Sequence, residues 1–562
     1  MPDNLARFQG LFWSTGLTLV IVAPWLLPGF LFGTDWPGPR HFSFPNTVTN
    51  LAPQLALLAL AAHVVPAEIV GKLLIAGTLL VAALGAYRAM PGDGFVPRAV
   101  ASLVYTVNPF VYGRLHYGQL FLLAAYAILP WLALRVRHFL AAPTPVRGLF
   151  VAAWLVLIGA LDLHLFLAAF VLCGVMGIIY GISKARDREY LAHLGRGSLV
   201  GSAAAVLGSA YWLIPFASGA SPEARTVAGI GASDIRVYQA VGDPHLGLIP
   251  NLLGLYGFWA ESIGRFPSFK LFAPVWPIVL VVLLMIALVG SLWVLLPRGD
   301  NSRRDLRPWV IGLLIAGTIA LILDVGAADS RIAVLVSWLD RAFPPYRGMR
   351  DSEKWAAILA LVYAQLVPLG VVAVTAAVKT RVPSRRLREM TQALVTGLAL
   401  ALPLYYGNGL LFGMHAQLRP SQYPAGWYQA DRVLLTDPHP GRAVFLPWHQ
   451  YLAISFVDNT NKVVASPAPS FFSIPVLISP NGEIPGIVTP GDPDQVAVSG
   501  LVIAARAGDW APILARHNIK YLLLAREVDW RGYSYLGEER GLELVADYGS
   551  VVVYRNLLWD SY

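Results

Sequence analysis

The stretch "FAPVWPIVLVVLLMIALVGSLWVLLP", residues 272–297, contains 26 residues and no charged side chain. A helix of this length crosses the hydrocarbon core of a bilayer, which needs about 20 predominantly apolar residues. Comparable apolar runs recur along the 562-residue chain, which is 56% hydrophobic and only 13% charged. Soluble globular proteins do not carry several such runs. The sequence therefore predicts a polytopic membrane protein.

The other apolar runs give the layout of the membrane domain. The run at residues 50–65, closed by Pro66, is too short to cross the bilayer, so we expect a helix in the interface plane. The first span follows Arg7 and lacks a small-residue cleavage site, so it is expected to remain as a signal anchor. Eleven spans are predicted, at residues 8–32, 67–89, 97–112, 119–139, 147–163, 165–183, 197–216, 272–297, 308–327, 355–378 and 391–413.

The positions of Lys and Arg predict the orientation of these spans. With the N-terminus in the cytoplasm, the cytoplasmic gaps contain 19 Lys and Arg residues, Arg298 among them, and the short outer gaps contain few, as the positive-inside rule requires. This topology accounts for the net charge of +9, so we exclude nucleic-acid binding. The loops 33–66 and 217–271 then lie outside. The single cysteine, Cys173, lies within an apolar run and supports neither a disulfide framework nor a cysteine metal cluster.

The remaining segment, residues 414–562, is polar enough to fold in water. "GRAVFLPW" (441–448) and "SVVVYRN" (550–556) are typical of strands, and "DWAPILARHNIKYLLLA" (509–525) predicts an amphipathic helix that runs into a strand. The predicted fold is an all-α polytopic membrane domain over residues 1–413 with about eleven transmembrane helices. A C-terminal extracytoplasmic α/β domain follows it.

The first outer loop, "LFGTDWPGPRHFSFP" (31–45), contains a single carboxylate, Asp35, followed by Arg40 and His41. A carboxylate held at the membrane surface, where water is excluded, can act as a general base toward a hydroxyl. Arg40 and His41 are candidate substrate-binding residues beside it. The alternative is an ordinary loop aspartate that forms an Asx-turn before the prolines.

A second outer motif, "NPFVYGRLHYGQ" (108–119), joins the third and fourth spans. Its Arg114, His116 and Gln119 could bind an anion or sugar hydroxyls, although interfacial tyrosine anchoring with a snorkelling arginine explains the same residues. The 217–271 loop adds aromatic residues whose ring faces are candidates for sugar stacking. These are Tyr238, Tyr256 and Trp259.

Two ionisable residues, Asp162 and His164, interrupt an apolar run at "GALDLHLF" (159–166). Ionisable groups at that depth are costly and usually face a cavity or a partner. Together with Asp35, this pair would offer hard oxygen donors and one imidazole to a divalent cation such as Mg²⁺ or Mn²⁺. The alternative is a polar helix hairpin without metal.

The segment "DRAFPPYRGMRDSEKW" (340–355) is the exception to the charge rule, because its cations lie in an outer gap. If a helix begins near Asp351, Arg350 and Lys354 share one face, and Arg347 lies one turn earlier. Arg347, Arg350 and Lys354 would then form a clamp for a phosphate group. The alternative is internal ion pairing with Asp351 and Glu353.

Taken together, the outer Asp35 after the first span, the Asn108–Gln119 loop, the "YRGMRDSEKW" element (346–355) and the "GRAVFLPW" strand resemble bacterial membrane glycosyltransferases of the GT-C superfamily. The likeness is greatest to the YfhO-type and arabinofuranosyltransferase-like members. The resemblance implies a lipid-linked sugar donor, usually a polyprenyl phosphate sugar, an outer-side acceptor and an essential aspartate in the first outer loop, where Asp35 matches. Many relatives carry a longer acidic motif there, whereas this loop has one carboxylate.

The sequence and the resemblance together predict an inverting glycosyltransferase of the bacterial cytoplasmic membrane, active in cell-envelope glycan biosynthesis. Its expected partners are the lipid bilayer, a polyprenyl-phosphate sugar donor and a glycan or glycolipid acceptor. Two alternatives are a transporter or flippase of a lipid-linked sugar and a non-catalytic assembly protein. A flippase needs polar groups at mid-bilayer, and the predicted mid-span positions are nearly all Ala, Leu, Val, Ile and Gly.

Overall fold

A computed structural model describes residues 2–296, 301–484, 487, 489 and 491–561. Residues 297–300, which include Arg298 and the end of one predicted span, lie outside this description. Among the described residues, eight helices are long and apolar enough to cross a membrane, or nine if the bent pair Arg385–Tyr406 and Asn408–Ala416 forms one span. The chain is a multi-pass membrane protein.

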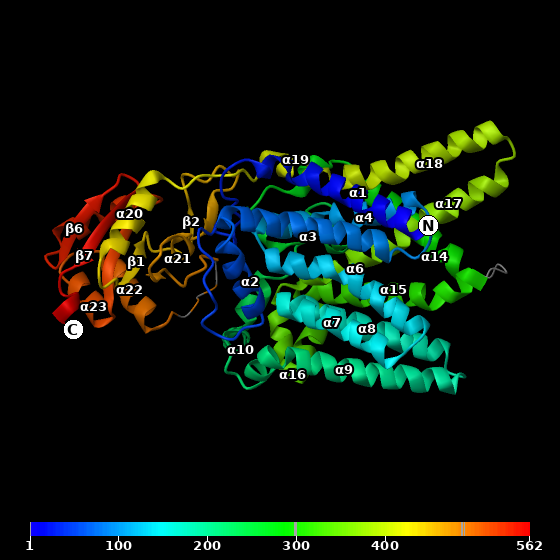
Figure 1. The fold of residues 1–562 in the computed structure, drawn as a ribbon, viewed down its shortest axis with the longest axis horizontal. Coiled ribbons are helices and arrows are strands. Elements are labelled where there is room, and N and C mark those ends of the chain that lie inside the picture. The colour runs from blue at the N-terminus through cyan, green and yellow to red at the C-terminus, as the bar shows by residue number, and fades with distance from the viewer. Residues whose placement is uncertain (1, 297–300, 485–486, 488, 490, 562) are drawn as a thin grey trace.

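The helices form an elongated bundle with the C-terminal domain, here called the tail, at one end and the N-terminus at the other (Figure 1). The bundle helices are α1 (Pro2–Val22), α3 (Ala67–Ala89), α4 (Phe95–Thr106), α5 (Pro109–Tyr117), α6 (Leu120–Ala141), α7 (Pro145–Leu161), α8 (Leu163–Ser183), α9 (Arg188–Ala217), α14 (Trp276–Leu295), α15 (Asn301–Val325), α17 (Ala356–Arg381) and α18 (Arg385–Tyr406).

Two of the eleven predicted spans do not form a single helix that is long enough to cross a membrane. The span predicted at 97–112 breaks into α4 and α5 at Asn108, because the residue before Pro109 avoids helical geometry. The Asn108 side chain instead caps α5 by accepting a hydrogen bond from the Val111 amide at 3.0 Å. The span predicted at 147–163 is the 17-residue α7, which ends where Asp162 begins to cap α8.

Close helix packing in the bundle depends on glycine. Gly290 of α14 and Gly370 of α17 face each other, and a Cβ atom on Gly370 would lie 2.0 Å from the Ile286 carbonyl oxygen. Small residues let membrane helices approach backbone to backbone, which increases van der Waals contact where no hydrophobic effect drives association.

Short elements cover the tail-side end of the bundle. Helix α2 (Ala52–Ala62) lies across this end, as expected for the predicted in-plane helix (Figure 1). The other elements are η1 (Ala23–Leu26), α10 (Pro222–Gly229), α11 (Ala232–Val237), α12 (Leu248–Leu253), α13 (Trp259–Ser262), η2 (Phe269–Phe272), η3 (Gly326–Ala328), α16 (Ser330–Ala342), η4 (Pro344–Arg350), η5 (Ser352–Trp355), η6 (Asn408–Leu410) and α19 (Leu411–Ala416).

The tail is an α/β domain around a five-stranded sheet of order β4-β1-β5-β7-β6. Strand β1 is parallel to β4 and β5, whereas β7 is antiparallel to β5 and β6. The predicted strands and the helix that runs into β5 are all present. The elements are α20 (Ala425–Thr436), β1 (Arg442–Leu446), β2 (Tyr451–Ala453), β3 (Val463–Ala465), α21 (Ala468–Phe471), β4 (Val476–Leu477), α22 (Pro493–Ala504), α23 (Trp510–Arg516), β5 (Ile519–Ala525), η7 (Trp530–Glu538), β6 (Leu542–Asp547), β7 (Val551–Asn556) and η8 (Trp559–Ser561).

The first outer loop is built into the tail. Phe30 and Phe32 belong to the apolar core on one face of the tail sheet, together with Tyr423 and Trp427. Phe30 also exchanges backbone hydrogen bonds with Ser421 at 2.8 and 2.9 Å. Because these contacts bury aromatic surface, the tail and the loop that carries Asp35 are held together.

Candidate active site

Asp35 lies between the bundle and the tail. Its backbone amide donates to the Tyr117 carbonyl at 2.6 Å, which ties the first loop to the end of α5. Its Oδ1 atom accepts a hydrogen bond from the Tyr451 hydroxyl of the tail at 2.8 Å. The residue as a whole is partly exposed.

Burial raises the pKa of Asp35 to about 6. Hydrogen bonds from Tyr451 and Gln119, and the charges of Lys354 and Arg265, act in the opposite direction. A general base works best when its pKa lies near the working pH, because it is then both ionised and basic enough to take a proton. Asp35 has these properties at neutral pH.

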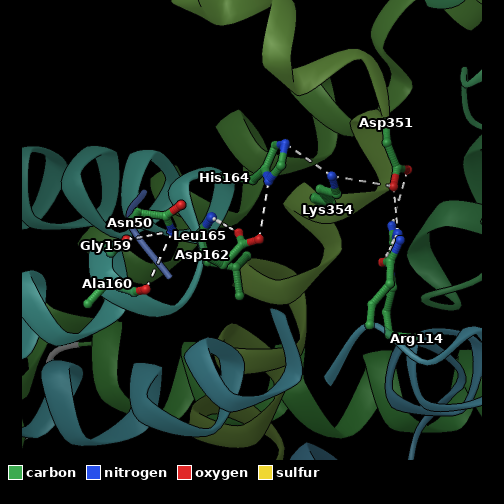
Figure 2. A network of polar contacts seen from close by, with 10 residues as sticks. Asn50, Arg114, Gly159, Ala160, Asp162, His164, Leu165, Asp351 and Lys354 are labelled. Carbon is green, nitrogen blue, oxygen red and sulfur yellow. Dashed lines mark hydrogen bonds and ion pairs between the residues drawn. The ribbon is translucent and has the colours of Figure 1, made fainter. Parts of the chain in front are cut away.

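Arg114 is fully buried and connects Asp35 to the segment before α17. Its guanidinium forms a two-point pair with Asp351, at 2.5 and 3.1 Å (Figure 2). It also pairs with Glu353. It donates to the Gln119 side-chain oxygen at 2.8 Å, and Gln119 in turn bonds Asp35. Burial opposes ionisation of Asp351, but the charges of Arg114 and Lys354 and the hydrogen bonds from Arg114 together outweigh it and hold the pKa of Asp351 below its usual range.

Lys354 is held by a second branch of the same network. Its Nζ atom lies 3.1 Å from His164 Nε2 and 3.8 Å from Asp351 Oδ2 (Figure 2). Because an ammonium can only donate, His164 accepts at Nε2 and donates from Nδ1 to Asp162, at 3.2 Å. Asp162 accepts from the Leu165 amide at 2.8 Å. Asp35, Arg114, Gln119, Asp162, His164, Asp351, Glu353 and Lys354 are called the tail-side cluster below.

A resident metal ion does not fit the predicted pair Asp162 and His164. One ring nitrogen of His164 is bonded to Asp162, and the Lys354 ammonium occupies the position in front of the other. Across the part of the chain that the structure describes, no three His, Cys, Asp or Glu side chains come together as metal ligands. Asp162 and His164 lie where α7 is followed by α8, bonded to each other, and His164 is also bonded to Lys354.

The basic segment differs from the predicted helix. Helix α17 begins at Ala356, and residues 344–355 form two short 3-10 turns separated at Asp351, so Arg350 and Lys354 are not placed by one α-helical face. Arg350 pairs with Asp234 at 2.8 Å and lies 4.3 Å from the centre of the Tyr238 ring. Arg347 pairs with Asp340 at 2.5 Å. Both guanidinium groups border a small recess that Ser352 also lines.

No protein-family model matches the chain, and no curated protein sequence matches it significantly. Among solved structures, it is similar to the arabinofuranosyltransferase AftD from Mycobacteria. Two cryo-EM structures of that protein give TM-scores of 0.59 and 0.57 at 16% identity. The chain has the GT-C fold.

The alignments cover 97% of this chain but only 41% and 40% of AftD, so the chain spans about two fifths of the length of the structures it matches. A more distant match is the archaeal oligosaccharyltransferase AglB from Archaeoglobus fulgidus, with a TM-score of 0.40 at 13% identity, covering 98% of this chain and 70% of that chain. The similarity to AftD confirms the predicted GT-C resemblance at the level of the fold.

Three residues that were predicted to bind substrate, Arg40, His41 and His116, have other partners in the structure. Arg40 pairs with Asp431 of the tail at 2.6 Å, and the His41 amide donates to the Ser470 carbonyl at 2.9 Å. Both residues therefore join the first loop to the tail. His116 is buried beside the Phe266 ring, with the ring centres 5.4 Å apart.

The three predicted sugar-stacking aromatics differ in accessibility. Tyr256 and Trp259 are only 2% and 4% exposed, because they pack against Trp276 and Tyr117 respectively. Neither offers an open ring face. Tyr238 remains partly exposed beside Arg350, so any stacking in this loop depends on Tyr238.

Sequence analysis missed Tyr451, Arg265 and Asp234. Tyr451 and Arg265 both act on Asp35, and Asp234 pairs with Arg350. No local pattern marks them, because each is brought to the site by a segment distant in sequence. The position of Tyr451 just after the predicted strand 441–448 was the only available signal, since loops that follow parallel strands often carry functional residues.

Proposed function

We propose that the chain is a membrane glycosyltransferase that moves a sugar from a polyprenyl-phosphate donor to a glycan or glycolipid acceptor. The observation that carries this proposal is Asp35, a carboxylate with a raised pKa, in the same cluster as the Lys354 ammonium. The GT-C fold supports it. The tail would lie on the outer face of the bacterial cytoplasmic membrane.

The proposed reaction is a single inverting displacement. Asp35 takes the proton from the acceptor hydroxyl while its oxygen bonds to the anomeric carbon of the donor sugar. The bond between that carbon and the phosphate oxygen breaks on the opposite side, and its electron pair leaves with the polyprenyl phosphate. Holding base, acceptor and donor in one site contributes several kcal/mol to catalysis.

The leaving phosphate gains negative charge, which nearby cations would stabilise. The charge of Lys354 acts on Asp35 more strongly than that of Arg265, and Arg350 with Arg347 borders the adjacent recess. All three are held by carboxylates or, for Lys354, also by His164, so they are fixed in place before a ligand arrives. Preorganised charge of this kind acts without reorganisation at the moment of reaction.

The isoprenoid chain of the donor needs an apolar path in the membrane domain. A groove of about 500 Å³ lies between α7, α8 and α9 and is lined by apolar side chains, glycines and serines. Phe166 lines the groove and follows His164 of the tail-side cluster by two residues. We propose that it holds the lipid chain while the phosphate meets Lys354.

Filling this groove should weaken binding of long-chain donors selectively. Gly174 and Gly177 line it, and a Cβ atom at either position would meet nothing within 4 Å. Leu at either position fits the α8 backbone but displaces lipid, and loss of about two buried methylene groups raises KM roughly tenfold. We expect this increase for a long-chain donor and little change for a short-chain analogue.

The matched control is Gly16→Leu on α1, where a Cβ atom also meets nothing within 4 Å and the residue is exposed. It should leave KM unchanged for both donors. Equal KM values of Gly177→Leu and the wild type for the long-chain donor would remove the groove from the proposal.

The function itself is tested by reconstituting the purified protein in vesicles with radiolabelled polyprenyl-phosphate sugars and a panel of glycan and glycolipid acceptors. Transfer of label to an acceptor, with inverted anomeric configuration, is the expected result. Movement of intact lipid-linked sugar across the bilayer without transfer would favour the transporter alternative.

A further inference from the structure

The tail contributes one side chain directly to Asp35. Tyr451 is the first residue of β2 and follows β1 by a short connection, yet its hydroxyl lies 2.8 Å from Asp35 Oδ1. Burial and the charge of Asp35 hold the pKa of Tyr451 well above its usual range. The phenol therefore stays protonated and donates its hydrogen bond to the carboxylate throughout the physiological pH range.

The segment around Tyr451 is fixed on the first loop by several further contacts. Strand β2 pairs with β3, and the Ala465 amide at the end of β3 donates to the Thr34 carbonyl at 2.7 Å. The Asn459 side chain donates to the Phe32 carbonyl at 2.7 Å. These bonds fall on residues that immediately precede Asp35, so the tail holds both the backbone and the side chain of this loop.

The bundle side of Tyr451 is closed by Arg265, whose guanidinium lies 5.6 Å from the centre of the phenol ring. The Asn461 side chain bonds the Arg265 carbonyl, which connects the same tail segment to the 217–271 loop. Tyr451 thus lies between the first loop and the 217–271 loop, and its hydroxyl donates a hydrogen bond to Asp35.

We infer that Tyr451 is a positioning residue through which the tail completes the active site by orienting the Asp35 carboxylate. This inference rests on the proposed function, in which Asp35 is the base. A base must be held within about 0.5 Å of its productive position, and a hydrogen bond to an ionised acceptor is among the stronger means of holding it. From the bundle, Gln119 also hydrogen-bonds this carboxylate.

The charged and titratable groups that face Asp35 come from several elements. They are Tyr451 from β2, Lys354 from η5, Arg265 after α13, Tyr117 from α5 and Tyr238 after α11. Tyr451→Phe removes only the hydrogen bond that favours the ionised carboxylate and leaves the other groups in place. The pKa of Asp35 should therefore rise in Tyr451→Phe. On acidification, this variant should lose activity at a higher pH than the wild type does.

The experiment compares Tyr451→Phe with Tyr423→Phe in the full chain. Tyr423 is the matched control, because its hydroxyl also joins the tail to the first loop, through the Pro37 and Gly38 carbonyls at 2.9 and 2.8 Å, without touching Asp35. The Asp35 carboxyl band is followed by infrared spectroscopy during a pH titration and is assigned by its absence in Asp35→Asn. The pH profile of kcat is measured in parallel.

In Tyr451→Phe the infrared midpoint and the acid limb of kcat should both move up by about one pH unit, equivalent to a tenfold loss of activity on the acid side. Part of that loss should be recovered at alkaline pH, and KM for the donor should change little. Tyr423→Phe should leave the midpoint unchanged. An unchanged midpoint in Tyr451→Phe would overturn the inference.

The infrared titration needs no turnover, so it decides the role of Tyr451 even if the wild-type protein transfers no sugar. If the wild type transfers no sugar but the infrared midpoint of Asp35 is shifted in Tyr451→Phe, the proposed function is rejected. The effect of Tyr451 on Asp35 is then still supported. A uniform loss of kcat at all pH values in both tyrosine variants would assign Tyr451 to tail docking alone and would also overturn the inference.

Discussion

Replacing Asp35 by Asn is expected to lower kcat for sugar transfer at least a hundredfold. Asparagine keeps the size of the side chain and can still accept the Tyr451 hydrogen bond, but its amide cannot take a proton from the acceptor hydroxyl. A positioned general base contributes about 10²–10⁴ in rate. Donor affinity should change little, because the proposed phosphate contacts come from Lys354 and Arg350.

The measurement is single-turnover transfer in proteoliposomes, with donor binding measured separately. Asp93→Asn is the matched control, because Asp93 is an exposed carboxylate at the end of the bundle away from the tail, paired only with Arg98. It should retain wild-type kcat. Turnover by Asp35→Asn above about a tenth of wild type would exclude Asp35 as the base.

The pH profile of the wild type also tests whether Asp35 is the general base. The pKa of Asp35 is raised to about 6, and the base acts only when it is ionised. The rate should therefore fall as the pH drops through about 6 and stay level above it, until another group titrates. This acid limb should be absent from the residual activity of Asp35→Asn.

Replacing Arg114 by Met is expected to cause the largest loss of stability among single substitutions in the tail-side cluster. Arg114 is fully buried and pairs with both Asp351 and Glu353, so its removal takes away their shared cation and leaves Lys354, 3.8 Å from Asp351, as the neighbouring positive charge. Breaking a buried ion pair from one side costs about 3–5 kcal/mol. The loss should be visible as a lower thermal-unfolding midpoint in detergent.

Two further variants identify the cause of this loss. The triple variant Arg114→Met, Asp351→Asn, Glu353→Gln removes the uncompensated charges and should recover part of the midpoint. Arg386→Met, which changes an exposed arginine at the other end of the bundle, should leave the midpoint unchanged. If Arg114→Met melts like the wild type, the network shown in Figure 2 does not hold the segment before α17.

The membrane architecture and the tail strands could be predicted because their signals are local. The apolar run at 272–297 and the alternation in "GRAVFLPW" each depend on neighbours within one element. The break at Asn108 was less accessible, because an apolar count over 97–112 ignores the restriction that Pro109 imposes on the residue before it. More spans were therefore predicted than the described residues contain helices long enough to cross a membrane.

The candidate site was predictable in its residue types but not in its pairings. Local spacing predicted Arg350 and Lys354 on one helix face as a phosphate clamp, with pairing to Asp351 and Glu353 as the alternative. In the structure Arg114, more than two hundred positions earlier, binds both acids, and Lys354 lies 3.8 Å from Asp351. The contact between Asp35 and Tyr451 spans 416 positions. Such contacts follow from how the bundle and the tail fold together, which no short motif encodes.

In the proposed mechanism Asp35, Lys354 and Arg350 border one donor site. The most direct test is a cryo-EM structure of the full chain in nanodiscs with a non-reactive polyprenyl-phosphonate sugar analogue. We expect the phosphonate to lie within hydrogen-bond reach of Lys354 or Arg350, with the sugar between the phosphonate and Asp35. Density for the headgroup at the opposite end of the bundle, or away from Asp35, would contradict this mechanism.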